Sequence, residues 1–255
     1  IGKIDGVINY VRRMSEWTVT AALFEFGPDN EPKPIIGIVH APALGLTYLA
    51  ARGAGAVRIH KTAVGEKRDK VVPSMTSSLD GSVLSYGMSF IPSESQRALD
   101  VASSLAGRPA DIKRVGPVSL DLCKVADGTY DAYFEPMLHV WDIAGIAAGT
   151  VVVWEAQGTL SRWDGERIHW RHDNDVVASN GLIIRELQHY LQEHLAHSYV
   201  FCAYRRETFA HAVLIYRLSG RSLTHVSYMD PDGGYHRWHT TEWFSANGPM
   251  VVMRK

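Results

Sequence analysis

The sequence has no excess of charge of either sign, and this excludes several kinds of partner. Its 26 Lys and Arg residues nearly balance 27 Asp and Glu residues, which leaves a formal net charge of −1. Such a chain has no long-range field that would attract nucleic acid or an anionic membrane. No basic run carries interleaved aromatic residues either, so we expect neither nucleic acid nor a membrane as a partner.

Cysteine and long apolar runs are also scarce. The two cysteines, Cys123 and Cys202, are too few and too far apart for a disulfide framework or a metal cluster. Cys123 lies in an apolar helical stretch and is predicted to be a buried thiol. No apolar run is long enough to span a bilayer and no signal peptide is visible, so we expect a cytoplasmic protein. The chain begins with Ile1 rather than Met, as a fragment of a longer protein would.

The chain does contain an alternation of strand-like and helix-like segments, which predicts a mixed α/β domain. The expected strands are 18–26, 35–40, 46–51, 83–86, 132–135 and 151–154; the expected helices are 93–106, with Ser93 as its cap, 119–126, 142–150 and 180–194. The segment 27–34 contains three prolines and is predicted to be an irregular turn.

The segment 135–158 holds the strongest candidate for a functional carboxylate. Asp142 follows Trp141 and precedes a run of small residues, which predicts the start of a tightly packed helix. The positive end of the helix dipole favours an anion or a metal–phosphate assembly at that place. Asp is also a preferred N-cap residue, so the second interpretation is that Asp142 only caps the helix.

A second carboxylate motif opens the chain. Asp5 and Gly6 occupy a turn-like position before an alternating, strand-like run. Together, the IDG sequence at 4–6 and the WD sequence at 141–142 resemble two sequence signatures of the inositol monophosphatase family. The segments 35–57 and 114–135 are similar to that family's central hairpin and to its glycine-led helix with the following strand, so the resemblance covers about residues 1–195.

The resemblance implies an α/β fold of the layered sugar-phosphatase type, truncated at its N-terminus, and a magnesium-dependent phosphomonoesterase. The substrate would be a small polyol or nucleotide phosphate, hydrolysed by a metal-activated water. By position, the resemblance implies that Asp5 and Asp142 are catalytic, that they and the Ile4 carbonyl hold Mg²⁺, and that substrate is bound by Gly6, Gly116, Pro117, Val118 and Glu135.

Two of these assignments have structural alternatives. The Gly116–Pro117 pair has the chemistry of an ordinary strand-to-helix turn. Glu135 alone would be an unremarkable carboxylate at the end of a strand, although its spacing of seven residues from Asp142 is that of the family.

The chain departs from the family within the first signature. Where the family has Asp, Pro and Thr, this sequence has Gly2, Lys3 and Val7, and the family's metal-binding glutamate belongs to an upstream part that the chain does not contain. Since Mg²⁺ prefers oxygen ligands, these losses predict that activity falls by orders of magnitude. The alternative function is a catalytically degraded family member that acts as a binding or assembly module. A fold that lacks elements also exposes apolar surface, which predicts association into a homo-oligomer.

Residues 197–255 are expected to form a second domain after the phosphatase-like domain 1–196. Their β-branched and aromatic residues predict two or three antiparallel strands. The segment is similar to the C-terminal half of a papain-like cysteine peptidase of the bacteriocin-processing type, which implies that His211 is the general base and that Asp230 orients it. Cys202 is not in the position of the nucleophile, so an inert remnant or a binding module is the favoured interpretation.

Overall fold

The structure is a computed structural model that describes residues 1–240 apart from 29, 197–199, 207–208, 220–224 and 231–233. From residue 193 onward, it describes only the backbone of helices and strands. The chain divides into two compact units, Ile1–Gln188 and His189–Lys255, and each is described by itself.

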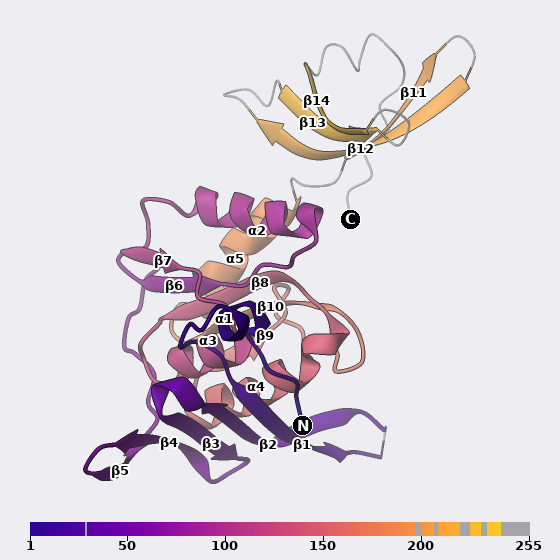
Figure 1. The fold of residues 1–255 in the computed structure, drawn as a ribbon. Coiled ribbons are helices and arrows are strands. Elements are labelled where there is room, and N and C mark those ends of the chain that lie inside the picture. The colour runs from indigo at the N-terminus through magenta and orange to yellow at the C-terminus, as the bar shows by residue number, and fades with distance from the viewer. Residues whose placement is uncertain (29, 197–199, 207–208, 220–224, 231–233, 241–255) are drawn as a thin grey trace. The chain divides into compact units, whose positions relative to one another are not determined.

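The first sheet of unit 1 is antiparallel, with its strands in chain order (Figure 1). The strands are β1 (Val19–Phe26), β2 (Pro32–Ala41), β3 (Leu46–Ala51), β4 (Gly55–Thr62) and β5 (Gly65–Lys70). The short helices α1 (Val7–Val11) and η1 (Pro42–Leu44) lie before β1 and between β2 and β3. The strands predicted at 18–26 and 46–51 are confirmed, the first to within one residue.

The second sheet is mixed, in the order β7-β6-β8-β10-β9. Its strands are β6 (Val83–Tyr86), β7 (Asp111–Lys113), β8 (Ala132–Leu138), β9 (Thr159–Ser161) and β10 (Asn174–Ser179). β6 is parallel to both β7 and β8, and the crossovers contain helices α2 (Pro92–Ser104) and α3 (Val118–Ala126). Parallel neighbours place their carboxyl ends at one edge of a sheet, where α/β proteins usually bind ligands.

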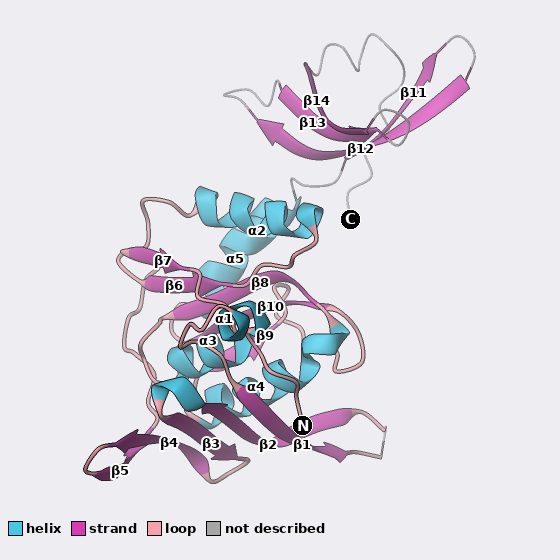
Figure 2. Ribbon diagram, viewed as in Figure 1, coloured by secondary structure: helices cyan, strands magenta, loops and turns pink. Residues whose placement is uncertain are grey.

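Helices separate and cover the two sheets. α3 and α4 (Ile143–Glu155) lie between them, and α2 with the start of α5 (Ile184–Ala196) lies on the other side of the second sheet (Figure 2). A short helix η2 (Val140–Asp142) leads into α4. The order of layers is therefore sheet, helices, sheet, helices, which confirms the predicted layered α/β fold class.

Helix α4 is buried on nearly all sides, and it overturns one prediction. Residues 151–154, expected as a strand, belong to this helix. A helix that packs on all sides has no polar face, so a run of valines gives no period that separates it from a buried strand. The packing is close: a Cβ on Gly37 of β2 would stand 2.2 Å from the Ala148 carbonyl oxygen. A Cβ on Gly149 would likewise stand 2.8 Å from Leu122 of α3.

Two prolines in β2 overturn the prediction of an irregular turn over 27–34. The strand already begins at Pro32 and also contains Pro34, and both pair with phenylalanines of β1. Pairing of β2 with β3, by contrast, begins only at Ile36. The prolines therefore lie where β2 has a neighbour on one side, and a strand tolerates a residue without an N–H donor at such a place.

The other predicted elements agree with the structure apart from their ends. β6 has the predicted bounds, while β8 runs three residues beyond the prediction. Helix α2 begins at Pro92 with Ile91 as its cap residue, so the prediction of Ser93 as the cap is wrong. Proline is well suited to the first turn of a helix, because its φ is already helical and its missing N–H needs no partner there. Cys123 is fully buried, as predicted.

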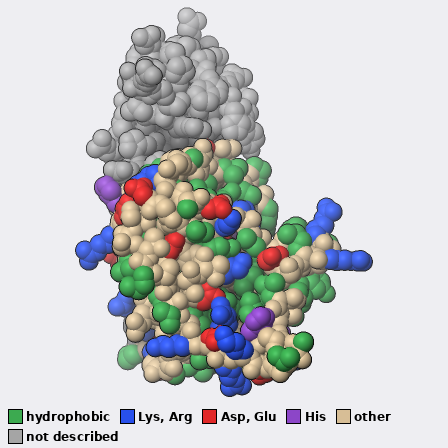
Figure 3. All heavy atoms as spheres, turned by 90° about the vertical axis from the view of Figure 1, so that its left-hand side faces the viewer, with side chains coloured by type: hydrophobic (Ala, Val, Ile, Leu, Met, Phe, Trp, Pro, Cys, Tyr) green, Lys and Arg blue, Asp and Glu red, His purple; other side chains and the backbone are tan. Residues whose placement is uncertain are grey.

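The face of the first sheet opposite α4 carries exposed apolar side chains. Val19, Leu23, Ile36 and Val57 project from it, and all are exposed. On the face of unit 1 drawn in Figure 3, Lys and Arg side chains are interspersed with Asp and Glu. Within the described residues, every helix is too short or too polar to span a membrane.

Unit 2 contains a four-stranded antiparallel sheet in chain order. Its strands are β11 (Val200–Arg206), β12 (Phe209–Ser219), β13 (His225–Asp230) and β14 (Gly234–Thr240), one more than the two or three predicted. His211 lies in β12 opposite Tyr204, and Asp230 ends β13. Their side chains lie outside the described part of the chain, so the peptidase-like roles stay predictions.

Candidate active site

Asp5 is held at the start of helix α3 by Ser119. Backbone hydrogen bonds of 3.0 Å join Asp5 and Thr18 in both directions and attach the N-terminal segment to the first sheet. The Ser119 amide and hydroxyl both donate to Asp5 Oδ2, at 2.9 and 2.6 Å. Gly6 then adopts a left-handed conformation with a φ of 81°, which turns the chain into α1. The sequence therefore fixes this carboxylate through a residue 114 positions away.

Asp142 stands at the start of α4 without capping it. It is the N-cap residue by position, but its side chain makes no capping hydrogen bond, so the interpretation as only a helix cap is wrong. One turn further, a Cβ on Gly145 would stand 3.3 Å from Asp5 Oδ2. Both carboxylates thus lie at the first turn of α4, where the helix dipole favours negative charge.

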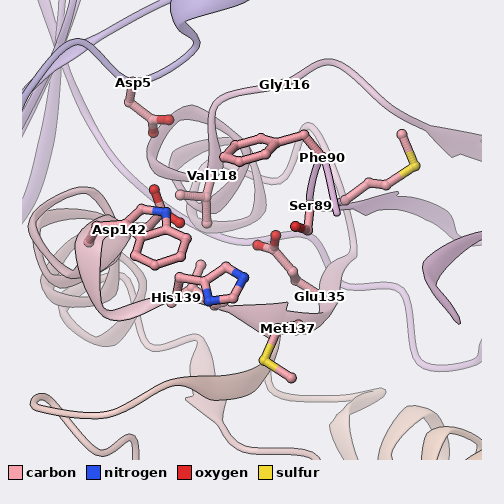
Figure 4. A pocket seen from close by; sticks show the side chains of 12 residues that line it. Asp5, Ser89, Phe90, Gly116, Val118, Glu135, Met137, His139 and Asp142 are labelled. Atoms are coloured by element: carbon pink, nitrogen blue, oxygen red, sulfur yellow. The ribbon is translucent and has the colours of Figure 1, made fainter. Parts of the chain in front are cut away.

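One pocket brings most of the predicted site residues together (Figure 4). It is lined by Asp5, Met88, Ser89, Phe90, Gly116, Val118, Glu135, Met137, Leu138, His139, Trp141 and Asp142. Its three carboxyl groups come from the N-terminal segment, from β8 and from the start of α4. Ile4, Gly6 and Pro117 are not among the lining residues.

Glu135 is buried between Tyr133 and Gly87. The Tyr133 hydroxyl donates to Glu135 Oε2 at 2.6 Å. A Cβ on Gly87 would stand 2.2 Å from the tyrosine oxygen and 2.4 Å from the Glu135 carboxyl carbon, so only glycine leaves room here. Burial raises the pKa of Glu135 to about 8, although the Tyr133 hydrogen bond opposes this. Glu135 is therefore a buried acid that contacts Tyr133 and Gly87 closely, and not an ordinary carboxylate at the end of a strand.

The turn before α3, residues 116–118, forms part of the pocket wall. Gly116, with a φ of 144°, and Val118 line the pocket, while Pro117 is the cap residue of α3. A Cβ on Gly6 would stand 3.3 Å from the Pro117 ring, so Gly6 and Pro117 pack against each other. The turn is thus both the strand-to-helix connection and part of the pocket wall.

Asn9 ties this turn to the N-terminal segment. Its Nδ2 donates to the backbone oxygens of Glu16 and Val115, at 2.7 and 3.0 Å. The same nitrogen would stand 2.7 Å from a Cβ on Gly116, so the left-handed glycine also provides room for the asparagine.

Burial raises the pKa of each acid in the pocket, and repulsion from neighbouring carboxylates adds to this for Asp142 and Glu135. Burial and then repulsion from Asp5 raise the pKa of Asp142 to about 6. Burial also raises the pKa of Asp5, although the Ser119 hydrogen bonds oppose this. A cation near these groups would stabilise their charged forms.

The metal-ligating side chains in the pocket limit which metal ion it could bind. In the described part of the chain, no three His, Cys, Asp or Glu side chains form a group that could hold an ion. Asp5 and Asp142 nevertheless match Mg²⁺, which takes one or two carboxylates from the protein and completes its shell with phosphate and water. The residues therefore fit one Mg²⁺ and not a site with several ions held by protein alone.

His139 joins the pocket wall to two other segments. Its Nε2 lies 2.9 Å from Glu94 of α2 and its Nδ1 lies 3.2 Å from Asp173. Asp173 also accepts a 2.8 Å hydrogen bond from the Val140 amide. The two carboxylates raise the pKa of His139 against the effect of burial. The imidazole stacks on Trp141 with ring centroids 4.0 Å apart and an interplanar angle of 16°.

Gly2 lies where the family resemblance places an aspartate. A Cβ at this position would stand 2.3 Å from Thr20 Oγ1 and 3.2 Å from the Ala144 Cβ. A longer side chain would point toward the first turn of α4, but Thr20 occupies its path.

Sequence reasoning missed three residues that shape the pocket. Ser119 follows the Gly116–Pro117 turn at a helix start, and that position signals a donor for a carboxylate. Tyr133 lies two residues before Glu135 in β8, and this spacing places both side chains on one face of the strand. Phe90 lies in a loop, and no sequence pattern points to it.

Comparisons with known proteins identify relatives of this chain. Residues 4–203 match the inositol monophosphatase family. The Nus factor SuhB of Pseudomonas aeruginosa is 31% identical over 198 residues, which are 76% of this chain and 67% of that protein. The histidinol-phosphatase of Streptomyces coelicolor is 33% identical over 193 residues, which are 76% of this chain and 68% of that protein.

A solved structure agrees as well. The inositol monophosphatase of Anabaena (Nostoc) superposes with a TM-score of 0.64 at 26% identity, over 74% of this chain and 69% of that one. The predicted family resemblance is therefore confirmed for the part of the chain that contains the pocket.

Proposed function

Because the chain belongs to the inositol monophosphatase family, we propose that it is a magnesium-dependent phosphomonoesterase acting on a small polyol or nucleotide phosphate. The observation that carries this proposal is the convergence of Asp5, Asp142 and Glu135 on one pocket. The name of the histidinol-phosphatase relative supports the same class of reaction.

The two aspartates would hold Mg²⁺ together with the Ile4 carbonyl. The bound ion supplies charge neutralisation for the phosphate and an activated water as the nucleophile. Ser119 keeps the Asp5 carboxylate in one orientation, which is the positioning on which phosphoryl transfer depends. The starts of α3 and α4 add backbone N–H groups, which favour the anionic phosphate.

Glu135 would bind a hydroxyl of the substrate. Burial and the nearby Asp142 raise its pKa to about 8 and so favour its neutral form in the absence of a cation. In either protonation state, a carboxyl oxygen can accept a hydrogen bond from an alcohol group.

Phosphate release tests this proposal. The purified chain would be assayed on inositol 1-phosphate and 2′-AMP, with and without Mg²⁺, beside Asp142→Asn. We expect magnesium-dependent turnover that falls at least about a hundredfold in Asp142→Asn, because an active-site charge is lost. A Glu66→Gln control on the exposed strand β5 should keep its activity. A folded chain without turnover on either ester contradicts the proposal.

The alternative proposal is a degraded family member that acts in binding or assembly. Gly2 in place of a carboxylate favours it, as does the name of the SuhB relative, a Nus factor. Loss of turnover together with a defined complex in a pull-down would support this alternative.

The exposed apolar face of the first sheet supports the prediction of a homo-oligomer. Exposed apolar patches commonly mark interaction surfaces. Light scattering should give a mass above the 28.3 kDa of one chain, and a monodisperse monomer contradicts the prediction. The cytoplasmic location, the domain boundary at 196 and the peptidase-like tail stay predictions.

A further inference from the structure

The rim of the pocket is apolar, in contrast to its acidic floor. Met88, Phe90, Met137 and Trp141 line it. Phe90 is 85% exposed and Trp141 is 58% exposed as whole residues, so both aromatic rings have surface that the protein does not cover. Exposed apolar side chains around a concave site mark a surface that a ligand covers.

Trp141 is held in place before any ligand arrives. Its indole stacks on His139, which is itself fixed by Glu94 and Asp173 from two separate segments. A ring that is already ordered loses little conformational entropy on binding, so its contact area contributes more fully to affinity.

The loop that carries Phe90 is also fixed by local hydrogen bonds. The Ile91 amide donates to Ser89 Oγ at 3.1 Å, and the Ser95 hydroxyl of α2 donates to the Ser89 carbonyl oxygen. Figure 4 shows Phe90 on the side of Gly116 and Val118, across the pocket from His139. The two aromatic residues therefore belong to different walls of one pocket.

From this arrangement we propose that Phe90 and Trp141 form a subsite for a planar aromatic ring of the substrate's alcohol. Given the proposed phosphatase function, on which this inference rests, the preferred substrate class is a nucleoside monophosphate and not a polyol phosphate. A nucleobase stacks on aromatic side chains. The hydroxyls of a polyol would lose water against this rim without gaining hydrogen bonds, which costs affinity.

Binding of adenosine in the absence of Mg²⁺ tests the subsite without hydrolysis. The full chain would be titrated with adenosine and with myo-inositol by ligand-observed NMR. We expect adenosine to bind, and Phe90→Ala to weaken it about tenfold because one stacking partner is removed. Phe90→Tyr, which keeps the ring, and Phe26→Ala, which removes an exposed ring at the end of β1, should stay within about twofold of the unchanged protein.

Kinetics provide the second measurement. In Phe90→Ala, KM for 2′-AMP should rise about tenfold, while KM for glycerol 2-phosphate stays unchanged. Adenosine that does not bind, or that binds Phe90→Ala as well as the unchanged protein, overturns the subsite even if both esters are hydrolysed. Adenosine binding that depends on Phe90 supports the subsite even if no ester is hydrolysed, and in that case only the phosphatase proposal fails.

Discussion

The Ser119 side chain and backbone both donate to a single oxygen of Asp5, at 2.6 and 2.9 Å. Thr18 Oγ1 lies 2.6 Å from the same serine hydroxyl, so a buried chain of hydrogen bonds connects the first sheet to the start of α3. This chain fixes one of the two carboxylates that we propose as metal ligands.

Ser119→Ala should therefore weaken both folding and activity. It removes one donor to a buried carboxylate and leaves the Thr18 hydroxyl without its partner, which costs about 1–3 kcal/mol of unfolding free energy. Urea unfolding measures this loss, and phosphate release should fall in parallel. Ser103→Ala on the exposed side of α2 is the control and should change neither quantity. Equal stability of Ser119→Ala and the unchanged chain would contradict the structural role.

The burial of the Asp121 carboxyl group predicts that the folding stability of the protein depends on pH. Both of its carboxylate oxygens are buried without a hydrogen-bond partner among the described residues, and burial raises its pKa to about 7 despite nearby Lys124 and Arg114. The folded state then binds a proton more tightly than the unfolded state, so this group's contribution to stability is greatest at acidic pH. The contribution is lost as pH rises from about 4 to about 7, and the loss amounts to roughly 4 kcal/mol.

The Asp121→Asn variant isolates this effect. Its unfolding free energy relative to the unchanged chain should increase between pH 4 and pH 8, since the amide does not ionise. Urea denaturation at the two pH values provides the comparison. A relative stability that does not change with pH would show that Asp121 does not titrate in this range.

Gly87 and Tyr133 should be energetically coupled. Gly87→Ala places a Cβ 2.2 Å from the tyrosine oxygen, and such overpacking costs about 1–3 kcal/mol. Tyr133→Phe removes that oxygen and the hydrogen bond to buried Glu135, which costs a similar amount. The tyrosine oxygen is then absent, although the Glu135 carboxyl group remains 2.4 Å from the added Cβ. The double variant should therefore be less destabilised than the sum of the two single variants, by about 1 kcal/mol. Additive changes would contradict the close contact.

A third carboxylate should be tolerated at position 2 only if space is made for it. Gly2→Asp alone should destabilise the chain, since its Cβ would meet Thr20 Oγ1 at 2.3 Å. In a Thr20→Ala background, the aspartate can point toward the start of α4 and add an oxygen ligand. We expect Mg²⁺ affinity, measured by calorimetry, to increase at least about tenfold, since ligand charge sets the affinity for hard cations. Thr20→Ala alone is the control, and equal affinity of the two variants would contradict the prediction.

The mixed α/β class was predictable because its signals are local, whereas the layered architecture and the acidic pair were predicted from the resemblance to one family. Asp5 sits beside a glycine whose left-handed φ ends an extended segment, and Asp142 precedes small residues that let a helix pack closely. The strands at 46–51 and 83–86 alternate or are bounded by turn residues, and their bounds follow from that pattern.

What the sequence did not reveal depends on contacts between distant segments. The period of 151–154 is hidden because α4 is buried on nearly all sides. Ser119 acquires its role only when the N-terminal segment reaches α3. Phe90 was missed because an exposed loop aromatic has no pattern of its own, and its position at the pocket depends on the loop after β6.

The contact between Gly37 and Ala148 has a consequence for the distance between the two aspartates. Asp5 is attached to the first sheet through Thr18, whereas Asp142 belongs to α4. The separation of the two carboxylates is therefore set by how far the helix stands from the sheet. Any side chain at position 37 would push α4 away from the sheet. A glycine outside the pocket therefore contributes to the separation of the two carboxylates that we propose as metal ligands.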